Sequence, residues 1–314
     1  MKTSLRHIVT RPRAVGSAYA VNGIEPVKIW DFDAGLIPTG FAITRAASAF
    51  GYDAAGRYVS YAANSLRFDA RPLLRTALLE TAATNLLSRA ITSASTGWTL
   101  NGAGGSNLTL NALGLFPGVL VSSSGAIWHR LMHIDEPNVV NGASYHLRAF
   151  FKFGTSGKIM VTLRSNAYSS ESRFIVSTTT TNILAGAFSD ITVTPLGVDG
   201  VYRLDANFVS NLTSSISVGF GPGSATTGEN VTLLAAQFET GTAGSSFINT
   251  TGAVATRPAD NAVWAAPVGT FGLRIVNGSG AVSNVPSVQV GAGWAPQAAP
   301  FFPARVLLYP VGAL

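Results

Sequence analysis

SYHLRAFFKF, residues 144–153, has the pattern that decides the fold. In an extended strand, successive side chains point to opposite faces of the sheet. One face of this strand would carry Tyr145, Leu147, Ala149 and Phe151. The opposite face would carry His146, Arg148, Phe150 and Lys152. A strand with one uniformly apolar face predicts a sheet that covers a hydrophobic core.

Similar runs lie on both sides of this strand, between residues 91 and 240. They are rich in β-branched and aromatic residues, and Gly, Pro, Asn or Asp separates one run from the next. Examples are GKIMVTLRS at 157–165, GVYRLDANFVS at 200–210 and NVTLLAAQFET at 230–240. Many short strands with such spacing are typical of a sandwich or jelly roll. We therefore predict an all-β fold in which residues 89–250 form a jelly-roll β-sandwich.

RTALLETAATNLLSRA, residues 75–90, is the exception to this pattern. Its leucines form two pairs, Leu78–Leu79 and Leu86–Leu87, that lie about two helical turns apart, and Pro72 suits a first helical turn. We expect one short helix here, which connects the N-terminal region to the first strand of the jelly roll. An ordinary core helix of a single domain remains the alternative.

The jelly roll is flanked by two smaller regions. Residues 1–88 are predicted to form an extended or β region that serves attachment and assembly. Within it, YDAAGRYV at 52–59 predicts a hairpin with Asp53 and Gly56 in the turn. Residues 251–314 are predicted to form a small C-terminal β region. Its low charge favours contact with a partner protein or a neighbouring subunit.

The composition limits the class of protein. The chain has 314 residues, of which 47% are apolar and only 11% are charged, and its net charge is +6. So small a charged fraction suits β-rich extracellular or virion proteins and oligomers. The basic residues are spread through the N-terminal part without a cluster, which argues against nucleic-acid binding. The chain has no cysteine, which excludes disulfides and thiolate metal sites.

Export and membrane insertion are not expected from the sequence. Arg11, Pro12 and Arg13 interrupt the apolar run that a signal peptide needs near the N-terminus. No apolar run approaches the length of a transmembrane helix. A protein of extracellular character without an export signal fits a virion component that leaves the bacterial cytoplasm by lysis.

Several phrases resemble a family of bacteriophage and prophage virion proteins. They are WDFDAGLIPTGFAITRAASAFGYDAAGRYVSYAANSLRFDARP (30–72), LLRTALLETAATNLL (73–87), GVYRLDANF (200–208) and AAQFETGTAGSSFINTTGAVATRPAD (235–260). Thr81 and Ala83 depart from the family, which has Pro and Arg there. The resemblance implies a tail fibre, head fibre, spike or other virion surface protein, of a phage or a gene transfer agent. It also implies a jelly roll similar to carbohydrate-binding modules.

Sugar binding is the site chemistry that suits a jelly roll best. Aromatic rings cover the apolar face of a pyranose, and polar side chains bind its hydroxyl groups. We predict a carbohydrate-binding set at the following positions: Trp98, Trp128, Arg164, Asn166, Tyr168 and Arg173. Large aromatic residues are also common in cores, so burial of these rings is the alternative.

The sequence gives less support to catalysis or metal binding than to sugar binding. His129 and His133 have the spacing of helical zinc ligands, but Arg130 stands where a zinc protease motif has Glu, and the flanks are β. A glycosidase needs two converging carboxylates, yet most Asp and Glu of 91–250 lie in or beside predicted turns. The chain is therefore expected to be no enzyme and to use no cofactor or metal.

Together these observations predict an adhesin-like virion surface spike or fibre that attaches the particle to host cell-surface polysaccharide. Its N-terminal region would contact other virion proteins, and the chain would form a homo-oligomer, a trimer or else a pentamer, because weak sugar contacts gain from avidity. The alternatives are a purely structural virion connector or decoration protein and a polysaccharide-degrading enzyme.

Overall fold

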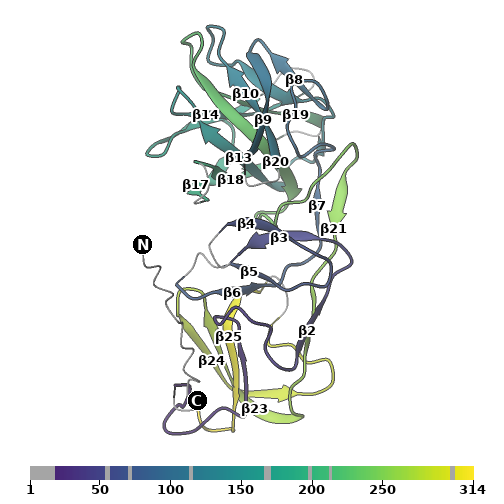
Figure 1. The fold of residues 1–314 in the computed structure, drawn as a ribbon, viewed down its shortest axis with the longest axis vertical. Helices are drawn as coiled ribbons and strands as arrows, with labels where there is room; N and C mark the ends of the chain where they lie inside the picture. Colours follow the sequence, from purple (N-terminus) through teal and green to yellow (C-terminus); the bar gives the residue numbers. More distant parts are fainter. Residues whose placement is uncertain are drawn as a thin grey trace, which may run out of the picture.

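The computed structural model describes residues 18–53, 57–69, 73–112, 116–165, 171–196, 200–211, 214–297 and 301–314. Within these residues the protein is all-β and contains no α-helix, as Figure 1 shows. Every pairing between named strands is antiparallel. The all-β prediction is confirmed. None of the described residues forms a helix long and apolar enough to cross a membrane.

Two sheets form a sandwich in the upper part of Figure 1. The first sheet has the order β17 (Phe188–Pro195), β18 (Tyr202–Val209), β13 (Ser144–Phe153), β20 (Asn230–Thr240), β10 (Phe116–Ser122) and β9 (Gly104–Ala112). The second has the order β16 (Thr181–Ala185), β15 (Glu171–Val176), β14 (Ile159–Ser165), β19 (Ser214–Gly221), β11 (Arg130–His133) and β8 (Trp98–Asn101), and β12 (Asn138–Val139) also pairs with β19. The predicted sandwich of residues 89–250 corresponds to these strands.

The sandwich core lies between the two sheets, where the apolar faces of their strands meet. The predicted inner face of β13 is confirmed, because its four residues belong to this core: Tyr145, Leu147, Ala149 and Phe151. The second sheet contributes alternate residues in the same way, such as Val161 and Leu163 of β14 and Phe174 of β15. Alternation of this kind places the intervening side chains of β14 and β15 on the outer face.

Segments from the N-terminal and C-terminal parts of the chain form a third sheet, the lower sheet, in the lower part of Figure 1. Its order is β1 (Lys28–Asp31), β25 (Pro303–Tyr309), β23 (Gly269–Asn277) and β24 (Val282–Val290). A second core packs against it, in which the rings of Trp30 and Trp264 meet edge to face with centroids 5.3 Å apart. Segments predicted as separate N- and C-terminal regions thus share one sheet and one core, while the boundaries at 88 and 250 stay predictions.

Short two-stranded ribbons complete the molecule: β2 (Phe41–Thr44) with β22 (Asn261–Trp264), β3 (Ala49–Tyr52) with β4 (Tyr58–Tyr61), β5 (Arg67–Asp69) with β6 (Thr76–Leu78), and β7 (Ala83–Asn85) with β21 (Ala255–Arg257). The hairpin predicted at 52–59 is confirmed as β3–β4. Its turn is closed by Asp53, whose amide donates to the carbonyl of Arg57 at 2.9 Å. Gly56 lies outside the described residues.

The helix predicted within 75–90 is wrong. This segment is extended and forms β6 and β7. Its backbone bonds go to distant segments: Leu79 exchanges hydrogen bonds with Phe301 at 3.1 and 2.8 Å, and the Leu86 amide donates to Phe238 at 2.8 Å. Intrinsic helix propensity is a weak preference that tertiary pairing overrides. The segment still joins the N-terminal part to β8, as a strand instead of a helix.

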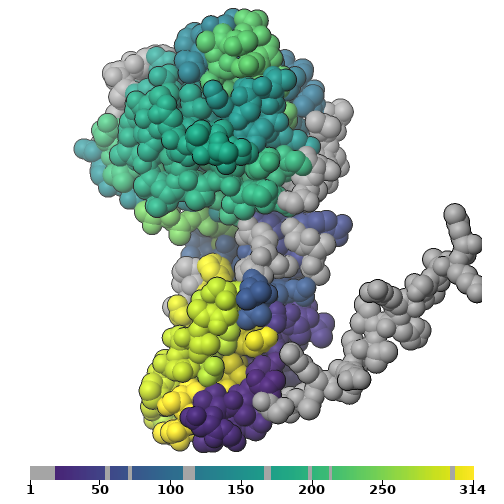
Figure 2. Space-filling view, turned by 90° about the vertical axis from the view of Figure 1, so that its left-hand side faces the viewer, coloured from purple at the N-terminus to yellow at the C-terminus, as the bar shows by residue number. Residues whose placement is uncertain are grey.

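The β3–β4 and β5–β6 ribbons lie between the sandwich and the lower sheet (Figure 1). The molecule is therefore elongated, and it narrows below the sandwich (Figure 2). The ribbons pack beside the outer side of β13, where the Tyr58 and Phe150 ring centroids are 5.4 Å apart. Consequently His146, Arg148 and Phe150 are buried although they face away from the sandwich core.

Candidate functional site

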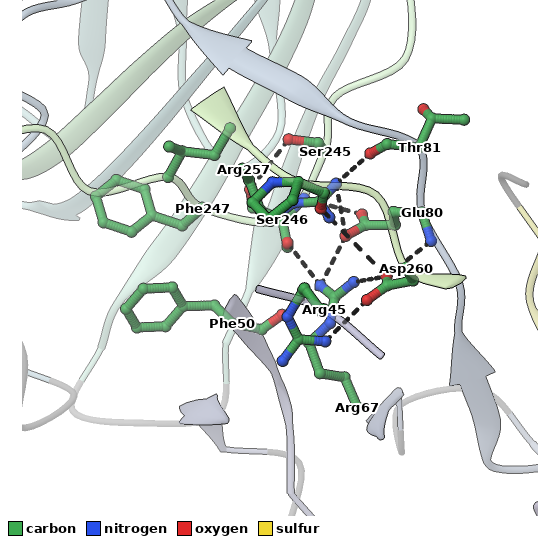
Figure 3. Close-up of polar contacts among 12 residues, drawn as sticks. Arg45, Phe50, Arg67, Glu80, Thr81, Ser245, Ser246, Phe247, Arg257 and Asp260 are labelled. Carbon is green, nitrogen blue, oxygen red and sulfur yellow. Dashed lines mark hydrogen bonds and ion pairs between the residues drawn. The ribbon is translucent and has the colours of Figure 1, made fainter. Parts of the chain in front are cut away.

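A buried charge network lies below the sandwich and joins five charged residues (Figure 3): Arg45, Arg67, Glu80, Arg257 and Asp260. Arg45 Nη1 lies 2.8 Å from Asp260 Oδ1, and Arg67 Nη1 lies 2.7 Å from Glu80 Oε2. Arg67 also pairs with Asp260, and Arg257 Nη2 lies 3.4 Å from Glu80 Oε2. The network thus ties β5 to the segments around β6 and β21.

The phrases that resemble the virion family supply all five residues of this network. Arg45 comes from ITRAAS, Arg67 from SLRFD, Glu80 from LLETAA, and Arg257 and Asp260 from TRPAD. These phrases lie as much as 215 residues apart in the sequence. The network therefore joins segments that lie far apart in the sequence. Sequence reasoning identified the phrases but not their convergence.

The protonation of this network follows from its own charges. Burial by itself raises the pKa of the Glu80 carboxyl, but the Arg67 and Arg257 guanidinium groups outweigh burial and hold the pKa below its ordinary value. For Arg67, burial lowers the pKa, and Glu80 and Asp260 raise it above the ordinary value. Glu80 is therefore a carboxylate at neutral pH, and its role is to pair with cations.

A second charge cluster covers the outer face of β13 and β18. Asp205 Oδ1 lies 2.7 Å from Arg148 Nε, and Asp205 Oδ2 lies 2.6 Å from Arg203 Nε. His146 Nε2 is 3.1 Å from Asp205 Oδ1. Burial raises the pKa of Asp205, but Arg148, His146 and Arg203 together hold it far below the ordinary value. The single carboxylate of Asp205 thus pairs with both guanidinium groups on this face.

Two of the predicted sugar-binding residues lie side by side on the outer face of the second sheet. Arg164 of β14 is the register partner of Glu171 on β15, and Arg173 of β15 is the partner of Thr162 on β14. Both arginines are half-buried. The Nε atom of Arg173 is buried without a hydrogen-bond partner in the described structure. The two guanidinium groups therefore flank a single carboxylate on one sheet face.

Arg130 of β11, which is buried and was not among the predicted site residues, joins this face from the other side. A Cβ atom on Gly219 of β19 would lie 2.7 Å from Arg130 Cδ, so the Arg130 side chain passes directly over this glycine. Its Nη1 atom reaches Glu171 Oε1 at 3.3 Å. Arg130 can lie this close to β19 only because residue 219 has no side chain. The sequence alone does not show this, because the pairing of β11 with β19 has to be known first. We call Arg130, Arg164, Glu171 and Arg173 the arginine strip.

The predicted aromatic residues separate into different places. Trp128 is 42% exposed and lies two residues before β11, where its carbonyl accepts a hydrogen bond from Arg130 Nη1 at 3.5 Å. Trp98 is only 2% exposed and belongs to the sandwich core, where its Nε1 donates to the Arg89 carbonyl at 3.1 Å. Its ring therefore offers no surface to a sugar. Asn166 and Tyr168 lie outside the described residues.

The two histidines of the WHRLMH run are buried and bonded to the protein. The amide of Ser124 donates to His129 Nδ1 at 2.9 Å. His133 packs edge to face on Trp98, and its Nδ1 lies 2.7 Å from the Asp135 carbonyl. Burial lowers the pKa of His133 below its ordinary value, against the opposing effect of Asp135. In the described part of the chain, no group of three or more His, Asp or Glu residues could hold a metal ion.

Comparison with known proteins gave structural neighbours only. No protein-family model matches the chain, and no curated protein sequence matches it. The CBM22-1 xylan-binding domain of Paenibacillus barcinonensis Xyn10C is 10% identical, with a TM-score of 0.32 over 51% of this chain and 94% of that domain. The CBM22-1–GH10 modules of Clostridium thermocellum Xyn10B, complexed with xylohexaose, are 12% identical, with a TM-score of 0.29 over 50% of this chain and 28% of that one. Values this low carry no argument about the ligand of this chain.

Proposed function

We propose that this chain is a non-catalytic polysaccharide-binding protein and that its arginine strip binds an anionic glycan. The observation that carries the proposal is the strip itself. The half-buried guanidinium groups of Arg164 and Arg173 share one outer sheet face with the carboxylate of Glu171, which also pairs with the buried guanidinium group of Arg130. Three positive charges against one negative charge leave the strip with an excess of two positive charges.

The chemistry of the strip suits uronate or sulfate groups. A planar guanidinium group binds such oxyanions through two parallel hydrogen bonds, which a neutral sugar cannot match. The Arg173 Nε atom is buried without a hydrogen-bond partner in the described structure, so any contact with the glycan would be made by the outer nitrogens of that half-buried side chain. Trp128, whose backbone carbonyl accepts a hydrogen bond from Arg130 Nη1, has a ring that is 42% exposed and lies against His129, and this ring would add a surface for the apolar face of a sugar.

The proposal extends to the setting in which the glycan is bound. A virion surface spike or fibre, attached through residues 1–88 to other virion proteins and assembled as a trimer or pentamer, would display many strips to host cell-surface polysaccharide. The support for this setting is the family resemblance, whose phrases supply the five residues of the buried charge network. Particle release by lysis is part of the same proposal.

A purely structural connector is the second candidate. The observation that favours it is the burial of Trp98, because that role requires aromatic residues to pack inside the sandwich. A polysaccharide-degrading enzyme has less support. A general acid needs a carboxyl with a raised pKa, whereas the pKa of Glu80 is lowered by Arg67 and Arg257 despite its burial.

The test measures how tightly the purified chain binds a polyuronate and a neutral glucan of equal length. The readouts are affinity electrophoresis and calorimetry, each at low and at high salt. We expect the polyuronate to bind more tightly and its affinity to fall with salt, because salt screens exposed charges. Arg164→Gln and Arg173→Gln should each weaken binding about tenfold, the equivalent of about 1.4 kcal/mol.

Lys158→Gln is the matched control, because this exposed lysine lies in the same sandwich and the substitution removes the same charge. It should bind the polyuronate like the parent chain. Binding to neither polymer, by protein that is folded, would sink the proposal and favour the structural role. Labelled protein applied to cells with and without their surface polysaccharide tests the host-attachment part separately.

A further inference from the structure

A cavity of about 440 Å³ lies where the sandwich, the ribbons and the lower sheet meet. We call it the junction pocket. Its lining comes from β3 to β6, from β13 and β18, from the loop after β20, and from the β23–β24 turn with Phe302. This volume is in the range of small-molecule sites, which cluster at boundaries between structural units. Neither the arginine strip nor Trp128 contributes to it.

One wall of the junction pocket is aromatic and held in place. The rings of Phe50 and Tyr58 stack at 5.4 Å with an interplanar angle of 15°. The Tyr58 hydroxyl accepts a hydrogen bond from the Phe247 amide at 2.9 Å, and the Tyr52 hydroxyl accepts one from Arg203 Nη1 at 2.9 Å. Phe302, which is 43% exposed, adds a further ring. The wall therefore needs little reorganisation to receive a ligand.

The polar lining contains side chains of both signs, and Glu80, Arg148 and Arg203 are already paired with charges behind the lining. Asp69 and Glu80 are acidic, and Arg148 and Arg203 are basic. Within the described structure, Arg203 uses Nε for Asp205 and Nη1 for Tyr52, which leaves Nη2 as a donor. The β23–β24 turn contributes the exposed side chains of Asn277 and Ser279. Charged groups that are already paired, together with amide and hydroxyl groups, favour a ligand without net charge that offers both donors and acceptors.

We infer that the junction pocket binds a neutral saccharide of one or two sugar units. Aromatic rings beside such a ligand would cover its C–H face, and the charged and amide groups would bind its hydroxyls. The ligand would contact the sandwich through Arg203 and the lower part through Phe302. Binding would therefore stabilise the arrangement of the two parts. This site does not depend on anionic glycan binding at the arginine strip.

The test uses a panel of neutral hexoses, pentoses and their disaccharides at millimolar concentration, with saturation-transfer NMR and thermal unfolding as readouts. At least one sugar should bind and raise the unfolding temperature. Phe302→Ala and Arg203→Gln should each weaken that binding at least tenfold. Ile183→Ala is the control, because this exposed residue lies on β16, away from the pocket; it should bind the sugar like the parent chain.

Two outcomes would overturn the inference. The first is that no neutral sugar binds to folded protein, or that a zwitterionic amino acid from a parallel panel binds and no sugar does. The second is that a sugar binds but Phe302→Ala and Arg203→Gln retain full affinity, which would place the site elsewhere. Since the polyuronate is a separate probe, failure here is distinguishable from failure at the arginine strip.

Discussion

Arg45 and Asp260 are 215 residues apart in the sequence, yet Arg45 Nη1 lies 2.8 Å from Asp260 Oδ1 with both side chains fully buried. Arg45 also donates to the carbonyls of Ala47, Ala62 and Ser65. One guanidinium group thus fixes the chain after β2, the turn after β4 and the segment after β21. The two halves of the lower part cannot separate without exposing these charges.

Removal of this guanidinium should be strongly destabilising. We expect Arg45→Met to lower the free energy of unfolding by about 3–5 kcal/mol, because it leaves Asp260 and three carbonyls short of a buried partner. The measurement is urea-induced unfolding. Arg57→Met makes the same chemical change at an exposed pair, Arg57–Asp53, and should cost about 0–1 kcal/mol. Equal losses in the two variants would contradict the interpretation.

Acid should unfold the protein through its paired carboxylates. Burial raises the pKa of Glu80 and of Asp205, but neighbouring cations hold both values below the ordinary ones, so the unfolded chain binds more protons. Stability from these pairs is therefore complete above about pH 5 and is lost as the pH falls through about 4 and below. Urea unfolding at pH 7, 5, 4 and 3 measures this. Asp205→Asn should show a smaller loss between pH 5 and 3, and a parent chain equally stable at these values would disprove it.

His133 should add a second, milder pH effect. Burial lowers its folded pKa below the ordinary value, so the unfolded chain takes up the proton first. Stability from the neutral ring is full above about pH 6.5 and falls as the pH drops through that value. His133→Gln should be less stable than the parent chain at pH 7.5 but lose less stability between pH 7.5 and 5.5. A parallel loss in both proteins would show that His133 is not the titrating group.

Gly221 permits a close backbone crossing in the second sheet. A Cβ atom there would lie 2.1 Å from the carbonyl oxygen of His129, which is backbone and cannot rotate away. We expect Gly221→Ala to destabilise by about 1–3 kcal/mol or more. At Gly291 nothing lies within 4 Å of an added Cβ, so Gly291→Ala should change stability by at most about 0.5 kcal/mol. Thermal unfolding of both variants provides the comparison, and a tolerated Gly221→Ala would refute the crossing.

The two tryptophans of the predicted sugar-binding set should behave oppositely. Trp98→Ala empties a core position and should cost about 3–5 kcal/mol. Trp128→Ala removes a ring that is 42% exposed and should cost less than about 1 kcal/mol while weakening glycan binding. Chemical unfolding and the polyuronate assay separate the two effects. A large stability loss in Trp128→Ala would assign that ring to packing.

Much of the fold could be predicted from local sequence patterns. The alternation in SYHLRAFFKF predicted that Tyr145, Leu147, Ala149 and Phe151 share one face, because side-chain direction in a strand has a period of two, and this face lies in the sandwich core. The hairpin at β3–β4 followed from turn chemistry in the same way. The sequence also predicts Arg164 and Arg173 as site residues; the register places them on one sheet face, and their role in binding stays a prediction.

Contacts between distant segments decided the rest. On the outer face of β13, His146, Arg148 and Phe150 are buried because the ribbons cover them. The alternation of residues within the strand does not show that another segment covers this face. The segment 75–90 is extended because its backbone pairs with distant segments, as the Leu79 amide does with Phe301 and the Leu86 amide with Phe238. Local periodicity thus determined which residues could be inside a sheet. Only the tertiary structure decided which faces became buried, which charges met in the network around Arg45 and Asp260, and which tryptophan remained exposed, because each of these depends on segments far apart in the chain.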